Sequence, residues 1–90
     1  MKFTVVWTPN AERRLADLWL SRPQLQCEIT AAANEVDTRL RLNPLGQGES
    51  RAGSLRIMLI GPLIVDFEVV LDDQRVEVLN VALPKQRGEE

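Results

Sequence analysis

The side chains of this chain best suited to chemistry are four cations in its second half. Arg51 lies in a glycine-rich stretch, and Arg56 begins the apolar run that follows it. Lys85 and Arg87 lie in the polar segment that follows the last apolar run. Guanidinium and ammonium groups bind phosphate or carboxylate oxygens, so these residues predict contact with nucleic acid or with an acidic segment of a partner protein. Surface solubility and an ordinary salt bridge are the alternative, and a solvated terminus is the simpler interpretation of Lys85 and Arg87.

Groups that exchange protons near neutral pH are scarce, because the chain has no His and no Tyr. Cys27 is the single cysteine and has no His to activate it, which favours an incidental thiol on a helix. Asp66 and Glu68 share one face of an alternating segment. Paired carboxylates can perform acid–base chemistry, but the alternative is that they simply face water, and near Arg56 they would repel RNA. We find no metal-ligand cluster or phosphate-binding glycine motif and expect no cofactor, no metal and no small-molecule substrate.

Size and charge narrow the class of protein further. A chain of 90 residues has room for one core, which predicts a single domain over residues 1–84 and a polar tail over residues 85–90. The net charge of −2 provides no general attraction to nucleic acid. No apolar run approaches the roughly 18–20 residues that span a bilayer, and the first residues lack the apolar segment of a signal peptide. We therefore expect a cytoplasmic protein without a membrane partner.

The first half of the chain predicts one strand and two helices. Residues 2–7 alternate as in a short strand, and Thr8-Pro9 then supplies an N-cap and a first-turn proline. A second amphipathic helix begins near residue 23 and ends at Asn43-Pro44, because proline cannot continue the helix. The small pair Ala32-Ala33 favours close approach to a neighbouring element, most simply the first helix in an αα-hairpin.

The second half predicts a loop followed by an antiparallel meander. Residues 43–54 have the composition of a loop, and strands are expected over residues 55–60, 63–71 and 75–83. The middle strand alternates apolar and acidic residues, which predicts one face on the helices and one face in water. If the first strand pairs beside the last, the sheet closes over the helices. We predict an α+β fold with a helical hairpin on a four-stranded, mainly antiparallel sheet, in the order β-α-α-β-β-β.

Three segments of this chain resemble the RelE/ParE superfamily of bacterial toxin–antitoxin toxins. VVWTPNAERRLADLWL is similar to the family's opening strand and first helix, and LRLNPLGQGESRAGSLRIMLIG to its helix end, loop and first meander strand. VDFEVVLDDQRVEVLNVAL is similar to the last two strands. IGPLIVDFEV resembles a compact branch in which Gly-Pro-Leu replaces the usual polar turn. The resemblance covers nearly the whole chain and implies the same β-α-α-β-β-β fold.

The resemblance also says what a nuclease of this family would need. In its ribosome-dependent members, basic residues on the meander strands bind the mRNA phosphate, and a Tyr or His near the C-terminus assists proton transfer. Such a set is chemically sensible, because cleavage by a 2′-hydroxyl requires proton removal and neutralisation of the phosphate. Here Arg56 stands at the leading basic position of the first meander strand, but Met58 occupies the next outward position. Leu63-Ile64 stands where the family often has Tyr-Arg, and no Tyr follows Lys85.

The resemblance therefore implies a toxin or toxin-derived component of a type II system, of the kind involved in plasmid stabilization. We expect a cognate antitoxin as partner and action by protein–protein contact, with gyrase as the family's best-known target, so an enzyme is not favoured. One alternative is a ribosome-dependent mRNA endonuclease that uses Arg51 and Arg56. Another is an interaction module that has kept the fold and lost toxicity. A protein partner would bind an apolar sheet edge or the surface of the helical hairpin.

Overall fold

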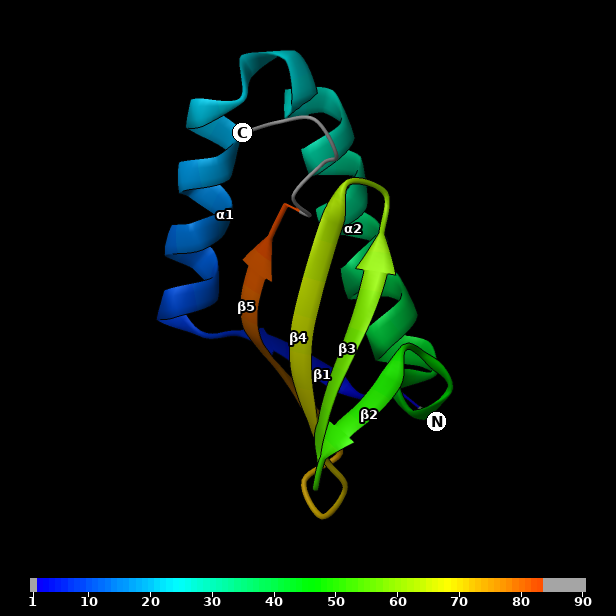
Figure 1. Ribbon diagram of the computed structural model, residues 1–90. Helices are drawn as coiled ribbons and strands as arrows, with labels where there is room; N and C mark the ends of the chain where they lie inside the picture. Colours follow the sequence, from blue (N-terminus) through cyan, green and yellow to red (C-terminus); the bar gives the residue numbers. More distant parts are fainter. Residues whose placement is uncertain (1, 84–90) are drawn as a thin grey trace.

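The computed structural model describes residues 2–83, apart from the side chains of residues 51 and 52. Its five strands form one sheet in the order β1-β5-β4-β3-β2, in which β1 runs parallel to β5 and the other neighbours are antiparallel (Figure 1). The predicted α+β class is confirmed, as is the pairing of the first strand with the last. The elements are β1 (Thr4–Trp7), α1 (Pro9–Ser21), a 3-10 turn (Pro23–Leu25), α2 (Gln26–Leu42), a second 3-10 turn (Pro44–Gly46), β2 (Glu49–Ala52), β3 (Leu55–Ile60), β4 (Leu63–Val70) and β5 (Arg75–Ala82).

The sheet has five strands rather than the predicted four, because β2 forms within the segment expected to be a loop. The β2 sequence ESRA is polar and shows no apolar alternation that would predict a strand. It becomes a strand by pairing with β3, with Glu49 opposite Ile57 and Ser50 opposite Arg56. Strand formation depends on such neighbours more than on intrinsic preference, so this element was not visible in the sequence.

Thr8 joins the first helix to the sheet. Its side chain accepts a hydrogen bond from the Ala11 amide at 3.2 Å, which confirms the predicted N-cap, and Pro9 occupies the first turn. The same hydroxyl donates to the Val78 carbonyl at 2.9 Å. Asn10 adds a bond from its amide to the Leu79 carbonyl, also at 2.9 Å. The start of α1 is therefore fixed to β5 at the point where the register between β4 and β5 shifts.

The core lies between one face of the sheet and the two helices. Side chains of β4 alternate between buried and half-buried along the whole strand, as the sequence predicts. Phe67 at its centre is fully buried. None of the described helices is both long and apolar enough to cross a membrane. The buried apolar residues are Ala11, Ile29, Ala32, Val36, Leu40, Met58, Ile60, Leu63, Val65, Phe67, Val69, Val76, Val78 and Val81.

The two helices meet at the 3-10 turn over Pro23–Leu25 and diverge toward their other ends (Figure 1). The Ala32-Ala33 pair does not bring them together along their length. Ala32 is buried and faces the β3–β4 turn, since a Cβ added at Gly61 would lie 3.4 Å from the Ala32 Cβ. Ala33 is half-buried and lines a groove between the helices. The predicted hairpin is therefore present but splayed, because each helix packs on the sheet.

Gly48 and Gly53, at the two ends of β2, provide a matched test of this packing. Both have a positive φ, 68° and 58°, so alanine is strained at either position, at about 1–2 kcal/mol. A Cβ at Gly48 would also overlap the Ile57 carbonyl oxygen, whereas a Cβ at Gly53 would meet nothing within 4 Å. We expect Gly48→Ala to lower the free energy of unfolding by at least about 1 kcal/mol more than Gly53→Ala. Urea denaturation followed by circular dichroism measures both, and equal losses would contradict the close contact between Gly48 and β3.

Candidate functional site

Of the four cationic residues predicted to bind a partner, the structure describes the backbone of two, Arg51 and Arg56. Lys85 and Arg87 lie outside the described residues. Arg51 lies in β2 at the point where the register with β3 shifts between Ser50 and Ala52. Such a bulge leaves its extra residue out of the regular ladder. Arg56 is in β3, the strand beside it, so the backbone brings Arg51 and Arg56 to neighbouring strands. Their role in binding stays a prediction.

Arg56 is held by the loop that precedes β2. It lies opposite the buried Phe67 on β4, so its side chain points to the helix side of the sheet. There its guanidinium donates to three carbonyl oxygens, those of Gln47 at 3.2 Å, Leu45 at 3.3 Å and Gly48 at 3.5 Å. Arg56 thus fastens the link between α2 and β2, a structural role that the sequence did not predict.

The Met58 side chain also points to the helix side of the sheet. The prediction that Met58 occupies an outward position of the first meander strand is wrong, because only 5% of Met58 is exposed. The outward positions of β3 are instead those of Leu55, Ile57 and Leu59, which alternate with the buried Met58 and Ile60. The described side chains of this strand therefore present no cation on the outward face.

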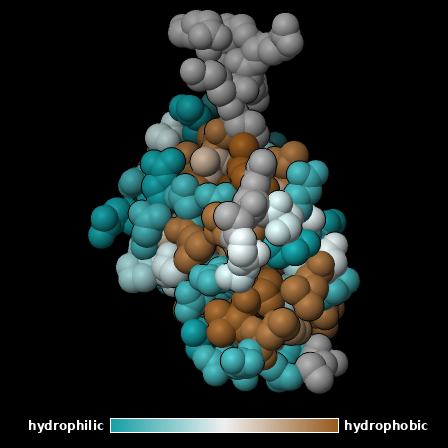
Figure 2. Space-filling view, turned by 60° about the horizontal axis from the view of Figure 1, so that its bottom comes forward, coloured by the Kyte–Doolittle hydropathy of each residue, from teal (hydrophilic) through white to brown (hydrophobic). Residues whose placement is uncertain are grey.

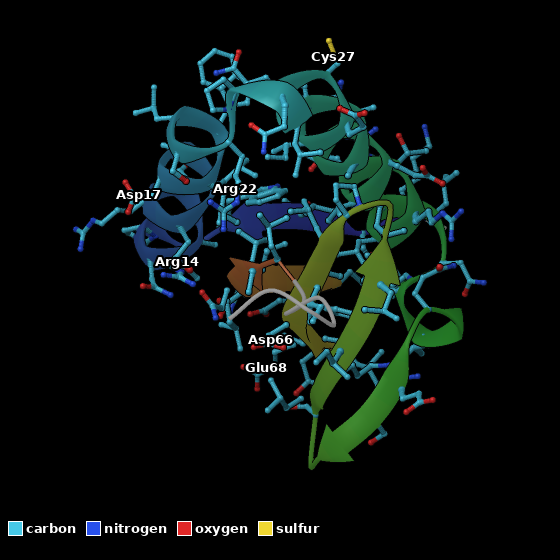
Figure 3. The ribbon with its side chains drawn as sticks, turned by 45° about the horizontal axis from the view of Figure 1, so that its top comes forward. Arg14, Asp17, Arg22, Cys27, Asp66 and Glu68 are labelled. Carbon is cyan, nitrogen blue, oxygen red and sulfur yellow. The ribbon has the colours of Figure 1, made fainter. Side chains whose placement is uncertain are left out.

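The sheet face turned away from the helices, here called the open face, is acidic. Asp66 and Glu68 point from β4 away from α1 and α2 (Figure 3). Glu77 lies directly opposite Glu68 on β5, and Glu49 of β2 lies opposite the outward Ile57. Among the strand side chains that the structure describes, the one cation on this face is Arg75.

Some of the carboxylates on or beside the open face already take part in ion pairs and hydrogen bonds. The Arg75 guanidinium lies 2.8 Å from an Asp73 carboxylate oxygen and 3.1 Å from one of Glu77. Carboxylates placed directly opposite each other on neighbouring strands repel, as Glu68 and Glu77 do here. Ser54 reduces that cost by donating to Glu68 at 2.6 Å. The described side chains of the open face therefore carry an excess of negative charge, which disfavours binding of a phosphate backbone.

An apolar groove lies between α1 and the first half of α2. Its volume is about 600 Å³. Trp19 stands on the α1 side, 40% exposed, and its indole donates to the Thr30 hydroxyl on α2 at 3.1 Å. Leu20 beside it is 68% exposed. The lining residues are Trp7, Glu12, Leu15, Ala16, Trp19, Leu20, Ile29, Thr30, Ala33 and Asn34.

The groove also reaches the sheet through Trp7 of β1. The Trp7 indole donates to the Asp37 carboxylate on α2 at 3.3 Å, and Asp37 in turn pairs with Arg41 at 3.0 Å. These bonds hold the apolar ring of Trp7 in a fixed position beneath the two helices. A concave apolar surface with a few fixed polar groups is typical of a ligand or peptide site.

Sequence reasoning predicted the helical surface as a partner site but did not name the residues of the groove. The apolar stripe of α1 runs through Ala11, Leu15 and Leu18 toward the core. Leu20 lies outside that stripe and is exposed. A large apolar residue outside the core-facing stripe of a helix indicates a second apolar surface, so Leu20 is the sequence signal that could have revealed the groove. Ala16, which lines the groove and is exposed, gives no such signal.

The other exposed large apolar residues of the described chain belong to several elements, and they are Val6, Leu42, Leu45, Leu59 and Leu71. On the face shown in Figure 2, apolar areas have polar residues between them. Cys27 is exposed on α2, at the end of that helix farthest from β2 (Figure 3). Within residues 2–83, no group of three or more acidic, His or Cys side chains is arranged to hold a metal ion. The apolar groove and the acidic open face are therefore the two surfaces to which function is best assigned.

Comparison with known proteins by sequence yields no match. No protein-family model matches the chain. None of the curated proteins matches it either.

Comparison of structures shows which proteins share the fold. A chain of the toxin–antitoxin complex RelBE2 from Mycobacterium tuberculosis is similar with a TM-score of 0.74 at 19% identity, over 96% of this chain and 95% of that one. A chain of the chromosomal ParDE toxin–antitoxin system from P. aeruginosa has a TM-score of 0.73 at 16% identity, over 93% and 98%. The RelE/ParE-like fold is thus confirmed. TrmO from Pseudomonas aeruginosa has a TM-score of 0.58 at 20% identity, and this chain covers 90% of itself but only 35% of that chain.

Alanine substitutions at Arg56 and at Arg39 compare an arginine that holds a loop with an arginine that makes only a surface ion pair. Arg56→Ala removes the charged donor from three loop carbonyls, so we expect the free energy of unfolding to fall by about 1–3 kcal/mol. Arg39→Ala breaks only a half-exposed pair with Glu35 and should cost about 0–1 kcal/mol. Urea denaturation measures both variants.

Because of these loop bonds, a loss of activity in Arg56→Ala would not by itself identify Arg56 as a binding residue. An Arg56→Ala variant as stable as Arg39→Ala would contradict the structural role. Arg56→Lys keeps the charge without the planar fork and shows which of the two matters.

Proposed function

We propose that this protein is the toxin, or a toxin-derived component, of a type II toxin–antitoxin system. The support is a fold shared over nearly the whole chain with chains of RelBE2 and ParDE. In this proposal the protein acts by protein–protein contact, and a cognate antitoxin neutralises it.

The charge of the open face is the observation that favours contact over RNA cleavage. Glu49, Asp66, Glu68 and Glu77 lie on this face, and Arg75 is already paired with two carboxylates. An mRNA endonuclease must hold a phosphate and stabilise the negative charge that develops on it. The sequence also offers no His or Tyr to exchange the protons of that reaction. A protein surface with complementary cations is the better fit to the open face.

The groove between α1 and α2 is the proposed antitoxin site. Its apolar lining and open shape suit the apolar face of an amphipathic helix, which binds through side chains one turn apart. Glu12 is the charged residue of the lining, so the bound helix should carry a Lys or Arg near it. The half-exposed Trp19 would be covered, and buried Trp residues commonly dominate binding energy at protein interfaces.

Induced expression distinguishes this function from its alternatives. If the protein stops growth, a ribosome-bound mRNA cleavage assay should show no cleavage, and a gyrase supercoiling assay tests the contact mechanism on the family's best-known target. Cleavage that disappears in an Arg51→Ala variant would replace the contact mechanism with the endonuclease. Growth that is indifferent to expression would favour an interaction module without toxicity.

Ala16→Arg should block the groove without unfolding the protein. Ala16 lines the groove, is exposed and lies in α1, where arginine is well tolerated. The first candidate for the cognate antitoxin is the product of any small open reading frame found immediately beside this one. We expect the variant to lose binding to the antitoxin and to escape its neutralisation. Co-purification and growth under co-expression provide the measurements.

Thr38→Arg is the matched control, because it adds the same charge at an exposed α2 position that is not part of the groove lining. It should be bound and neutralised like the unmodified protein. If Ala16→Arg is neutralised equally well, the antitoxin binds elsewhere.

A further inference from the structure

The edge of the sheet formed by β3 is only half covered. β3 extends over Leu55–Ile60, but β2 pairs only with its first three residues, Leu55 to Ile57. Figure 1 shows β2 beside the lower half of β3 and no strand beside its upper half. Within residues 2–83, Met58, Leu59 and Ile60 therefore have a strand neighbour on one side only, namely β4.

Leu59 directs its backbone groups to this uncovered edge. The Ile57 carbonyl oxygen points toward β2, because a Cβ added at Gly48 would overlap it. Residues in an antiparallel strand alternate between the two neighbours in the direction of their N–H and C=O groups. Leu59, two residues further on, therefore points its N–H and C=O to the same side as Ile57, where β2 no longer runs. An uncovered edge of this kind is a template for another strand.

A groove of about 440 Å³ adjoins this edge. Its walls include the β3 edge, the loop at Gly48 and Arg39 of α2. Leu59 is 71% exposed, the highest value among the exposed large apolar residues of the described chain. Arg39 is paired with Glu35 at a half-exposed site, and such a surface pair holds its partners only weakly. Arg39 is thus available to a second carboxylate.

We propose that the edge of β3 at Leu59 binds an extended segment of a partner polypeptide by strand addition. The segment continues the line of β2 beyond Gly48 and exchanges two main-chain hydrogen bonds with Leu59. Its side chains alternate in direction. An apolar residue lies against Leu59 and Ile64 on the open face, and an acidic residue points toward Arg39 on the helix side. This inference does not depend on the proposed toxin function.

The shape of the groove favours a flexible segment over a second copy of this chain. Two folded copies joined edge to edge need a long, flat and unobstructed strand edge on each. Here the uncovered edge spans three residues and is walled by the Gly48 loop and α2. A single extended chain fits between these walls, whereas the edge of a folded sheet brings its neighbouring strands with it.

The probe is a phage-displayed library of random decapeptides, selected on the full-length protein. Leu59→Pro serves for counter-selection, because proline removes the outward N–H. That N–H is not shared with β4, and proline is tolerated on the open side of an edge strand. Leu59→Ala is the matched control, which shortens the side chain but keeps the N–H. Amide chemical shifts of both variants establish that the fold is intact.

We expect selected peptides with alternating apolar residues and one acidic residue. Their affinity should fall about ten-fold on Leu59→Pro, as the loss of the one main-chain bond that the Leu59 N–H donates implies, and much less on Leu59→Ala. Methylation of the peptide nitrogen that faces Leu59 should cause the same loss, which keeps the test decisive if Leu59→Pro does not fold.

Three results would overturn the proposal. The first is the absence of any selected peptide, and the second is binding that neither Leu59→Pro nor peptide methylation weakens. The third is a dimer in solution that Leu59→Pro converts to a monomer, since a second copy of the chain would then be the occupant of the edge.

Discussion

The strict alternation of β4 is the constraint on which the other features depend. Leu63, Val65, Phe67 and Val69 are buried at every second position, and the residues between them are forced to the opposite face. Burial of this apolar row is the main favourable contribution of the strand, so the helices must cover that face. The acidic residues of β4, Asp66 and Glu68, therefore point to the open face. The charge of that face is thus a direct consequence of how the core is made.

The second consequence is the open angle between the helices. α1 is fixed to β5 by Thr8 and Asn10, while α2 reaches β1 through the bond between Trp7 and Asp37. The helices diverge from the turn over Pro23–Leu25 toward these two anchor points (Figure 1). The space left between them has the apolar lining that two core-facing helices supply. This space is the site at which we propose that the antitoxin binds.

The sequence predicted those features that local chemistry controls. Thr8-Pro9 starts α1, Asn43-Pro44 ends α2, and the alternation of residues 63–70 gives β4 its two faces. It did not predict β2, whose polar residues form a strand only because β3 offers a partner. It also did not predict the direction of Arg56, which depends on register. Arg56, Met58 and Ile60 alternate onto one face, and the burial of Met58 and Ile60 carries Arg56 to the helix side.

The fold by itself does not decide the function, since it also occurs within the much longer chain of TrmO. Function must therefore be argued from surfaces that the fold permits but does not require. A fold of this kind can place cations on the outward positions of β3, β4 and β5, yet here the described residues at those positions are carboxylates, apolar residues, Asn80 and the paired Arg75. Phosphate binding needs unpaired positive charge, whereas protein contact needs apolar concavities and unpaired strand edges. The described surfaces supply the second set, which is why we propose contact with a protein rather than cleavage of RNA.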